Sequence, residues 1–323
     1  MPSLLTVDNL GKRFTGRERE TAALAVDQVS FTLEQGETLG LVGESGCGKS
    51  TLARMIVGLT RPSSGQVLIQ GRELWNDKSV APQLKRELPS LVQLVFQDPY
   101  SSLNPRRSIG ATVREPLDIH RLGTRSERRQ TMETLLSQVG IPPDQASRLP
   151  HEFSGGQRQR IAIARALVLK PRLLVCDEPV SALDVSIQAQ ILNLLSQLKL
   201  ELGLSYLFIS HDLAVVAHMS RRIMVMFQGR VMETGPTDQL ITEPLHPYTQ
   251  LLLDSAPDPY EVLAREPSST DASNTPDLLL SHGEGCSFRD RCSHVLALCA
   301  DQAPALREIQ PGRFTACHWA ASA

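Results

Sequence analysis

The stretch TLGLVGESGCGKS, residues 38–50, joins a short apolar strand to a glycine-rich turn and the start of a helix. Its last eight residues match the pattern G-x-x-x-x-G-K-S/T. Glycines at these places let the backbone turn so that successive N–H groups point inward at an anion. A helix expected over residues 50–59 adds the positive end of its dipole. The stretch therefore predicts a loop that cradles phosphate groups.

The same loop predicts an ATP site with magnesium. Lys49 would reach the β- and γ-phosphates, and the hydroxyl of Ser50 would bind Mg²⁺. An apolar strand before the loop and an amphipathic helix after it are the context expected of a P-loop nucleotide hydrolase. The residues expected to contact ATP here are Gly43, Glu44, Ser45, Gly46, Cys47, Gly48, Lys49, Ser50 and Thr51.

Polar residues also follow two further apolar strands, expected over residues 172–176 and 205–209. Because open α/β sheets bind ligands at the carboxyl ends of their strands, Asp177 is expected to hold Mg²⁺ through a water. Glu178 is placed to orient and deprotonate the attacking water as a general base. His211, after the later strand, is expected to contact the γ-phosphate.

Strands and helices alternate along most of the chain, which favours an α/β fold with a largely parallel sheet covered on both faces. Further strands are expected over residues 29–33, 66–70 and 91–96, and a further helix over residues 186–201. Prolines and a charged helical run over residues 126–139 indicate a helical insertion. The predicted parts are a core of residues 1–97 and 151–235, a helical subdomain of residues 98–150, and an extension of residues 236–323.

The composition narrows the class of protein. The chain has 33 basic and 35 acidic residues and a formal charge of −2, a balance that argues against a protein that coats nucleic acid. It has no uncharged apolar run long enough to span a bilayer, and its start lacks the pattern of a secretory signal. We therefore expect a cytosolic chain with reduced thiols, whose transport role would need separate membrane subunits.

The octet FSGGQRQR, residues 153–160, indicates the family. Ser154 is a good helix cap, and Gly155 and Gly156 would leave the amides of the first helical turn open to an anion. The octet, with Gln157 as its fifth residue, resembles the signature motif of ABC ATPases. A second phosphate-binding helix end, remote from the first, is expected if it binds the nucleotide held by another subunit.

The resemblance extends to other segments. Gln97 resembles the Q-loop glutamine, with a catalytic and Mg²⁺-binding role; residues 181–184 resemble the D-loop; His211 resembles the switch histidine; and Phe14 is in the place of the aromatic residue that stacks on adenine. Residues 96–106 (FQDPYSSLNPR), 177–186 (DEPVSALDVS) and 246–249 (HPYT) look like the dipeptide, oligopeptide and nickel importer branch. The Pro99-Tyr100 form is more like the second, F-type ATPase of such systems.

This resemblance implies a RecA-like core that works as a head-to-tail dimer with a second ATPase subunit. It also implies two permease subunits, an extracytoplasmic substrate-binding protein reached through them, no nucleic acid, and a peripheral place on the cytoplasmic face of the inner membrane. The segment after Gln97 would lie where a cytoplasmic helix of the permease docks. The cargo, a peptide or a related solute such as nickel, is chosen by subunits other than this chain.

Four cysteines near the end of the chain, Cys286, Cys292, Cys299 and Cys317, have the spacing C-x5-C-x6-C-x17-C. In a cytosolic chain disulfides are disfavoured. Four thiolates could bind structural Zn²⁺, although zinc sites favour closer pairs, or a 4Fe–4S cluster, which also takes four thiolates. The tail resembles the C-terminal region of peptide-importer ATPases that carry such a cluster, with a structural role.

Two other functions remain to be weighed. ABC-type ATPases of DNA repair and chromosome organisation carry a long coiled coil or zinc modules in the helical region, and residues 98–150 leave no room for either. A non-hydrolysing regulatory or scaffolding subunit is the other alternative. The presence of Lys49, Asp177, Glu178 and His211 argues against it.

Overall fold

Strand β3 (Thr38–Val42), which leads into the glycine-rich turn, lies inside an eight-stranded sheet of order β11-β12-β10-β9-β3-β8-β7-β6. It pairs in parallel with β8 (Ser205–Ser210) and β9 (Arg222–Phe227). Strand β7 (Leu173–Asp177) pairs in parallel with β8 and with β6 (Val92–Val95). The structure, a computed structural model, describes residues 3–15, 22–76, 79–98, 102–255 and 285–320.

The C-terminal extension continues this sheet. Strand β10 (Arg230–Pro236) pairs antiparallel with β9 and with β12 (Arg313–Thr315), and β12 pairs with β11 (Arg307–Gln310). The sequence pattern indicated no strands there, because both are short and β11 is exposed along its length. Strand β12 forms because the edge of β10 offers it backbone partners, and β12 in turn offers its other edge to β11.

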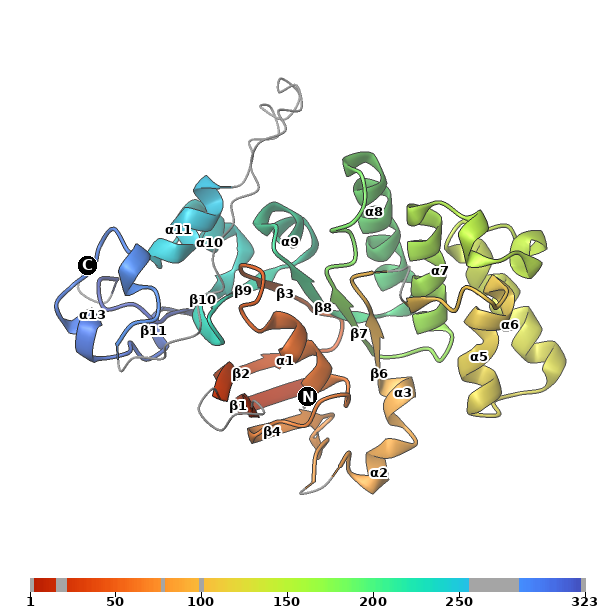
Figure 1. Ribbon diagram of the computed structural model, residues 1–323, viewed down its shortest axis with the longest axis horizontal. Helices are drawn as coiled ribbons and strands as arrows, with labels where there is room; N and C mark the ends of the chain where they lie inside the picture. The colour runs from red at the N-terminus through yellow and green to blue at the C-terminus, as the bar shows by residue number, and fades with distance from the viewer. Residues whose placement is uncertain (1–2, 16–21, 77–78, 99–101, 256–284, 321–323) are drawn as a thin grey trace.

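A second, antiparallel sheet packs against the first. Its order is β2 (Ala22–Leu33), β1 (Leu5–Thr15), β4 (Ser64–Ile69) and β5 (Arg72–Glu73). Figure 1 shows this sheet beside helix α1 (Lys49–Ile56), below the strands of the main sheet.

The core lies on both faces of the main sheet. Along β7, Leu173 and Val175 pack with α1 and the antiparallel sheet, whereas Leu174 and Cys176 pack on the opposite side. That opposite side is covered by α8 (Val185–Leu202) and α9 (Leu213–Met219) (Figure 1). A largely parallel sheet with two covered faces is the α/β arrangement that the alternation predicts, and the prediction of this fold class is confirmed.

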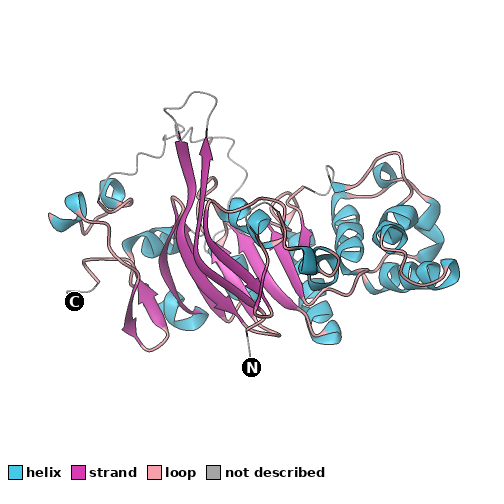
Figure 2. Cartoon of the chain, turned by 90° about the horizontal axis from the view of Figure 1, so that it is seen from below, coloured by secondary structure: helices cyan, strands magenta, loops and turns pink. Residues whose placement is uncertain are grey.

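Helices gather at one end of the molecule, as Figure 2 shows. Helix α5 (Ile109–Ile119) packs on α6 (Arg125–Gln138) and on α7 (Gly155–Leu167). Helix α6 begins with a capping box, in which Thr124 accepts from the Glu127 N–H while the Glu127 carboxylate accepts from the Thr124 N–H. The helix expected over residues 126–139 therefore forms, one residue earlier at each end.

The remaining elements are short, apart from the eight-residue α11. They are α2 (Pro82–Lys85), α3 (Leu88–Leu91), η1 (Pro143–Ser147), η2 (Pro150–Glu152), α10 (Thr237–Thr242), α11 (Pro247–Asp254), η3 (Arg289–Arg291) and α13 (Leu298–Asp301). Within the described ranges, the helices are all too short or too polar to cross a membrane.

Candidate functional site

The glycine-rich turn, residues 43–50, connects β3 to α1, and its glycines are required by the backbone. Gly48, at the start of α1, has φ 107°. A Cβ on it would lie 2.1 Å from the carbonyl oxygen of Ala25, and a Cβ on Gly43 would lie 2.1 Å from that of Met226. Since neither backbone neighbour can move freely, any side chain at these two positions would distort the turn.

Lys49 is buried at the first position of α1, with 4% of its surface exposed. Its Nζ donates to the carbonyl oxygens of Gly43 at 2.6 Å and Glu44 at 2.9 Å. It also lies 3.9 Å from Oε1 of Glu178. The ammonium group is thus held inside the loop, where it can exchange carbonyl partners for phosphate oxygens without crossing solvent.

Asp177 ends β7 beside the loop. The Ser50 hydroxyl donates to its Oδ1 at 3.1 Å. Burial raises the pKa of the Asp177 carboxyl; the bond from Ser50 opposes this rise, and the neighbouring Glu178 carboxylate adds to it. A hydroxyl and a carboxylate oxygen at this distance fit the ligand preference of Mg²⁺, and the buried carboxylate has a charge that a cation would offset.

Glu178 is the point where three strand ends meet. Gln97, after β6, donates from Nε2 to Glu178 Oε2 at 2.9 Å, and His211, after β8, brings Nδ1 to 3.2 Å from the same oxygen. Glu178 has φ 48°, an uncommon value for a residue with a side chain, and its N–H donates to Ile209 O at 3.0 Å. The uncommon backbone conformation therefore coincides with a carboxylate that contacts both Gln97 and His211.

The signature octet starts helix α7. Ser154 and Gln157 form a capping box: the Gln157 N–H donates to Ser154 Oγ at 3.3 Å, and the Ser154 N–H donates to Gln157 Oε1 at 3.0 Å. A Cβ on Gly156 would lie 2.4 Å from Cγ2 of Ile187, in α8, whereas one on Gly155 would meet Leu183 at 3.4 Å. Close packing of α7 against α8 therefore also requires a glycine at position 156. In Figure 1, α7 stands among the helices at one end, apart from α1.

The other predicted contacts lie around this centre. Phe14 is on β1 with 46% of its surface exposed, and Nζ of Lys12 lies 5.0 Å from its ring centre. Thr51 is half-buried in α1. Of the branch-specific segment 96–106, residues 99–101 lie outside the described residues.

The four tail cysteines all lie in the last described segment, residues 285–320. All are unpaired thiols; Cys292 is half-buried and the other three are buried. Burial raises the pKa of Cys286, and Cys299, Cys317 and Cys292 raise it further; burial raises that of Cys317 too. The His294 N–H donates to Cys292 Sγ at 3.4 Å. In the described ranges, however, no three His, Cys, Asp or Glu side chains stand close enough together to hold a metal ion as arranged.

Two contacts to the loop were not found by sequence reasoning. The Glu44 N–H donates to the Tyr248 hydroxyl at 3.0 Å, and the Glu44 carboxylate pairs with Arg291. Tyr248 belongs to the HPYT segment, which marked a branch of a family but indicated no position in the fold. Arg291 is separated from Glu44 by 247 residues, and nothing in the sequence pairs them.

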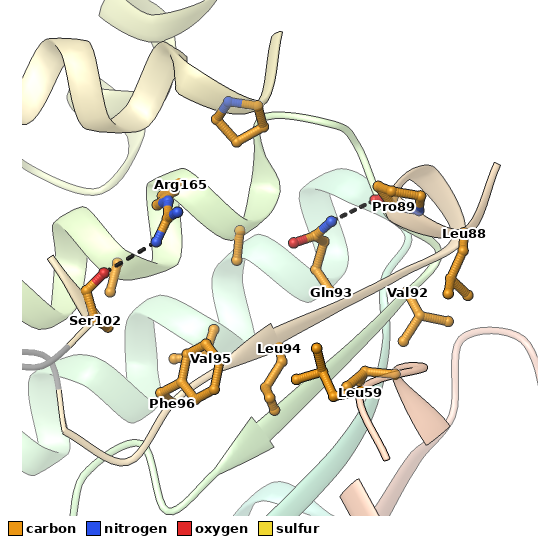
Figure 3. Close-up of a pocket in the computed structure, with 14 residues that line it drawn as sticks. Leu59, Leu88, Pro89, Val92, Gln93, Leu94, Val95, Phe96, Ser102 and Arg165 are labelled. Atoms are coloured by element: carbon orange, nitrogen blue, oxygen red, sulfur yellow. Dashed lines mark hydrogen bonds between the residues drawn. The ribbon is translucent and has the colours of Figure 1, made fainter. Parts of the chain in front are cut away.

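A groove of about 260 Å³ lies between the core and the helices. Figure 3 shows its lining, in which Leu59, Leu94 and Phe96 form an apolar side, and Arg165 donates to the carbonyl oxygen of Ser102. Leu59 is 62% exposed and Phe96 40%. The groove therefore borders Gln97, which follows Phe96 directly.

Comparison with known proteins identifies two families. Residues 26–181 match the family "ABC transporter", and residues 232–299 match "Oligopeptide/dipeptide transporter, C-terminal region". The chain is 47% identical to the oligopeptide transport ATP-binding protein AppF of Bacillus subtilis, covering 91% of this chain and 89% of that protein. It is 50% identical to a putative peptide import ATP-binding protein of Brucella abortus, covering 91% and 86%.

Solved structures resemble the core. The chain superposes on cbiO1 of Clostridium perfringens, part of the ABC transporter complex cbiONQ, with a TM-score of 0.65 at 27% identity, covering 75% of this chain and 92% of that one. It superposes on one chain of the dimeric ATP-binding cassette MJ0796, bound to ADP and phosphate after hydrolysis, with a TM-score of 0.64 at 28% identity, covering 72% of this chain and 98% of that one.

Replacing Asp177 tests the charge balance of the site. Because folding raises the pKa of this carboxyl, its stabilising contribution is present at low pH and is lost as the pH rises through the folded pKa. Without Mg²⁺ or nucleotide, Asp177→Asn should therefore unfold at a higher temperature than the wild type near neutral pH. The difference should shrink as the pH is lowered. Thermal unfolding between pH 5 and pH 8, chosen as about the range where most domains stay folded, measures it.

Asp254→Asn, at an exposed position at the end of α11, is the matched control and should change nothing. Added MgADP should raise the unfolding temperature of the wild type but much less that of Asp177→Asn. An Asp177→Asn protein that is less stable than the wild type at neutral pH would contradict the assigned cost of the buried charge.

Proposed function

Because the chain belongs to the ABC transporter family, among the ATP-binding proteins of oligopeptide and peptide import, we propose that it hydrolyses ATP to drive peptide uptake. The observation that carries this is the meeting of Gln97 and His211 on the Glu178 carboxylate, beside Lys49. A subunit that only bound nucleotide would need the phosphate loop, but not a carboxylate held by two polar side chains where water would attack.

The residues divide the chemistry among them. Lys49 binds the β- and γ-phosphates after giving up the carbonyls of the loop. Glu178 accepts a proton from the attacking water, and Gln97 and His211 orient that water and the γ-phosphate. When bound by Ser50, Asp177 and Gln97, Mg²⁺ supplies positive charge to the phosphate oxygens.

The second part of the proposal is a head-to-tail dimer. At the capped start of α7, the backbone N–H groups of Gly155 and Gly156 lie between the two capping-box residues and are available to an anion. This helix start lies apart from α1 (Figure 1). Such a site suits the nucleotide of a partner, and the related cassette MJ0796 forms a dimer. We take the partner of this chain to be a second ATPase subunit rather than an identical copy.

The third part concerns the membrane subunits. By family, the chain is part of a transporter complex with permease subunits, and we assign it to the cytoplasmic face of the membrane with two of them. The groove at Leu59 and Phe96 borders Gln97 and has an apolar side open to solvent (Figure 3). A permease helix in this groove would contact the segment that follows the catalytic glutamine. In the same proposal, residues 1–97 and 151–235 hydrolyse ATP, residues 98–150 respond to the permease, and residues 236–323 form the extension.

Removing the general base tests the proposed hydrolysis. Glu178→Gln keeps the shape of the side chain but cannot accept a proton, so ATP hydrolysis should fall by about a hundredfold or more. Binding of MgATP should remain, since Lys49 and Ser50 are intact. The rate of hydrolysis is measured as phosphate release by the chain with its partner subunits, and MgATP binding is measured by equilibrium titration.

Glu201→Gln, near the exposed end of α8, is the control and should keep wild-type turnover. Near-normal hydrolysis by Glu178→Gln would remove the assigned base. No hydrolysis by the wild type with its partners would favour the alternative, a regulatory or scaffolding subunit.

A charge placed in the groove tests the proposed docking. Leu59→Asp should weaken co-purification with the permease subunits, because a carboxylate would replace an apolar contact. Nucleotide binding by the free chain should be unchanged. Leu200→Asp, at a position 85% exposed on α8, is the control and should co-purify like the wild type. Equal recovery of both variants with the permease would exclude the groove.

The fourth part is a 4Fe–4S cluster on the four tail cysteines, with a structural role. Its support is the presence of four free thiols within residues 285–320, one of which, Cys292, accepts an N–H hydrogen bond of the kind that stabilises a thiolate. The sulfurs would have to move closer to bind any ion, since the described arrangement is not that of a metal site. Zn²⁺ is the alternative occupant.

Anaerobic purification distinguishes these occupants. The chain should be brown, with about four iron and four sulfide per chain as the cluster requires. Replacing Cys292 by Ser should lower both contents. Colourless protein with zinc, or protein without metal, would reject the cluster.

A further inference from the structure

Arg291 holds the second residue of the phosphate loop by two parallel hydrogen bonds. Its Nη1 donates to Glu44 Oε2 at 2.9 Å, and its Nη2 donates to Glu44 Oε1 at 2.7 Å. This fork geometry is the strongest form of a guanidinium–carboxylate pair. Arg291 ends the short helix η3 and directly precedes Cys292, so the contact joins the C-terminal extension to the nucleotide site of the same chain.

Aromatic rings hold the guanidinium in this position. It lies 5.7 Å from the ring centre of Phe227 and 5.6 Å from that of Phe288. These rings pack against Tyr248, with centres 4.7 Å and 5.3 Å from it. Tyr248 accepts the Glu44 N–H through its hydroxyl at 3.0 Å. Glu44 is therefore held at its backbone and at its side chain by one packed group of residues.

The pair has a consequence for binding because Glu44 carries a negative charge within the loop. Its own carbonyl oxygen accepts a hydrogen bond from Lys49 at 2.9 Å, so its carboxylate lies within a few bonds of the phosphate cradle. Charges separated by less than the Debye length, about 10 Å at 0.1 M salt, are only partly screened from each other. Without a cation beside it, the carboxylate would repel the phosphates of a nucleotide.

An ordinary surface ion pair is the alternative. The side chains of Arg291 and Glu44 are 41% and 39% exposed, and many pairs of that kind contribute nothing measurable. Three features set this pair apart: both guanidinium nitrogens are used, two rings cover the cation, and its carboxylate belongs to the phosphate loop. An isolated surface pair could use both guanidinium nitrogens but would lack the other two features.

We propose that Arg291 supports nucleotide binding through its charge: it neutralises the Glu44 carboxylate, which would otherwise repel the phosphates bound in the loop. The C-terminal extension thereby completes the ATP site of its own chain. This role does not depend on whether the four cysteines bind a metal, nor on whether the chain hydrolyses ATP. It needs only nucleotide binding, which can be measured without catalysis.

Equilibrium titration of the full chain with MgADP tests the proposal. Arg291→Gln should raise the Kd about two- to tenfold at low salt, the size expected for one uncompensated charge near several phosphate charges in a largely aqueous setting. At about 0.5 M salt the loss should become much smaller. Arg291→Lys keeps the charge without the fork, and its Kd should lie between those of the wild type and Arg291→Gln.

Charge removal at both positions separates this role from a structural one. Glu44→Gln added to Arg291→Gln should bring the Kd back toward the wild-type value, because the repelling charge is gone. Arg289→Gln is the matched control: Arg289 lies in the same η3 helix but pairs with Asp290 and the carbonyl oxygen of Ala300, and its loss should not change the Kd.

Three results would overturn the proposal. They are an unchanged Kd in Arg291→Gln, a loss that Glu44→Gln does not relieve, and an equal loss in Arg289→Gln. If Arg291→Gln does not fold, Glu44→Gln alone decides. It should bind MgADP at least as tightly as the wild type at low salt and with a stronger dependence on salt, because the unpaired Arg291 cation would then attract the phosphates. Weaker binding by this variant at low salt would contradict the charge argument.

Discussion

The parallel pairing of β3, β8, β7 and β6 is the constraint from which the site follows. Parallel strands end at the same edge of a sheet, so the residues just beyond their carboxyl ends are neighbours however far apart they lie in the chain. Gln97 follows β6 and His211 follows β8, and both contact the carboxylate of Glu178, which follows β7 between them. The phosphate loop leaves the same edge from β3, next to Asp177.

The site is electrostatically incomplete without its nucleotide. Lys49, Asp177 and Glu178 are all buried, with one positive and two acidic groups within a few ångströms. Burial raises the pKa of Asp177, which means that its ionised form is disfavoured in the folded chain. A bound metal–nucleotide complex would take the place of the hydrogen bonds that Lys49 makes to the loop carbonyls and that Ser50 makes to Asp177. The protein thus holds polar groups in a costly arrangement whose relief is ligand binding, as sites organised in advance for charged ligands do.

Sequence reasoning recovered the parts of the fold that local chemistry determines. Residues 38–42 form a strand as expected, and the helix expected from residue 50 begins at Lys49, because glycine turns and apolar runs act over a few residues. The gathering of the loop, Asp177 and Glu178 was also foreseen, since it follows from strand ends. The pairing of Arg291 with Glu44 was not, because no periodicity relates a short turn to a loop 247 residues earlier. Gly156 shows a different limit of sequence reasoning. The sequence pattern explained this glycine only by an anion site, whereas the fold shows that a side chain there would also collide with Ile187.

The C-terminal extension illustrates how a weakly patterned segment acquires a defined place. Its strand β12 pairs with β10, β10 with β9, and β9 with β3, so backbone hydrogen bonds connect it to the strand that carries the phosphate loop. Arg313 of β12 is buried 3.6 Å from Glu233, whose carboxylate also accepts the N–H groups of Leu245 and His246. Such a pair is costly to break from one side, because the other charge would stay buried alone. The extension is therefore anchored beside the nucleotide site by the sheet itself, and η3 needs only to be held by its own packing to reach Glu44.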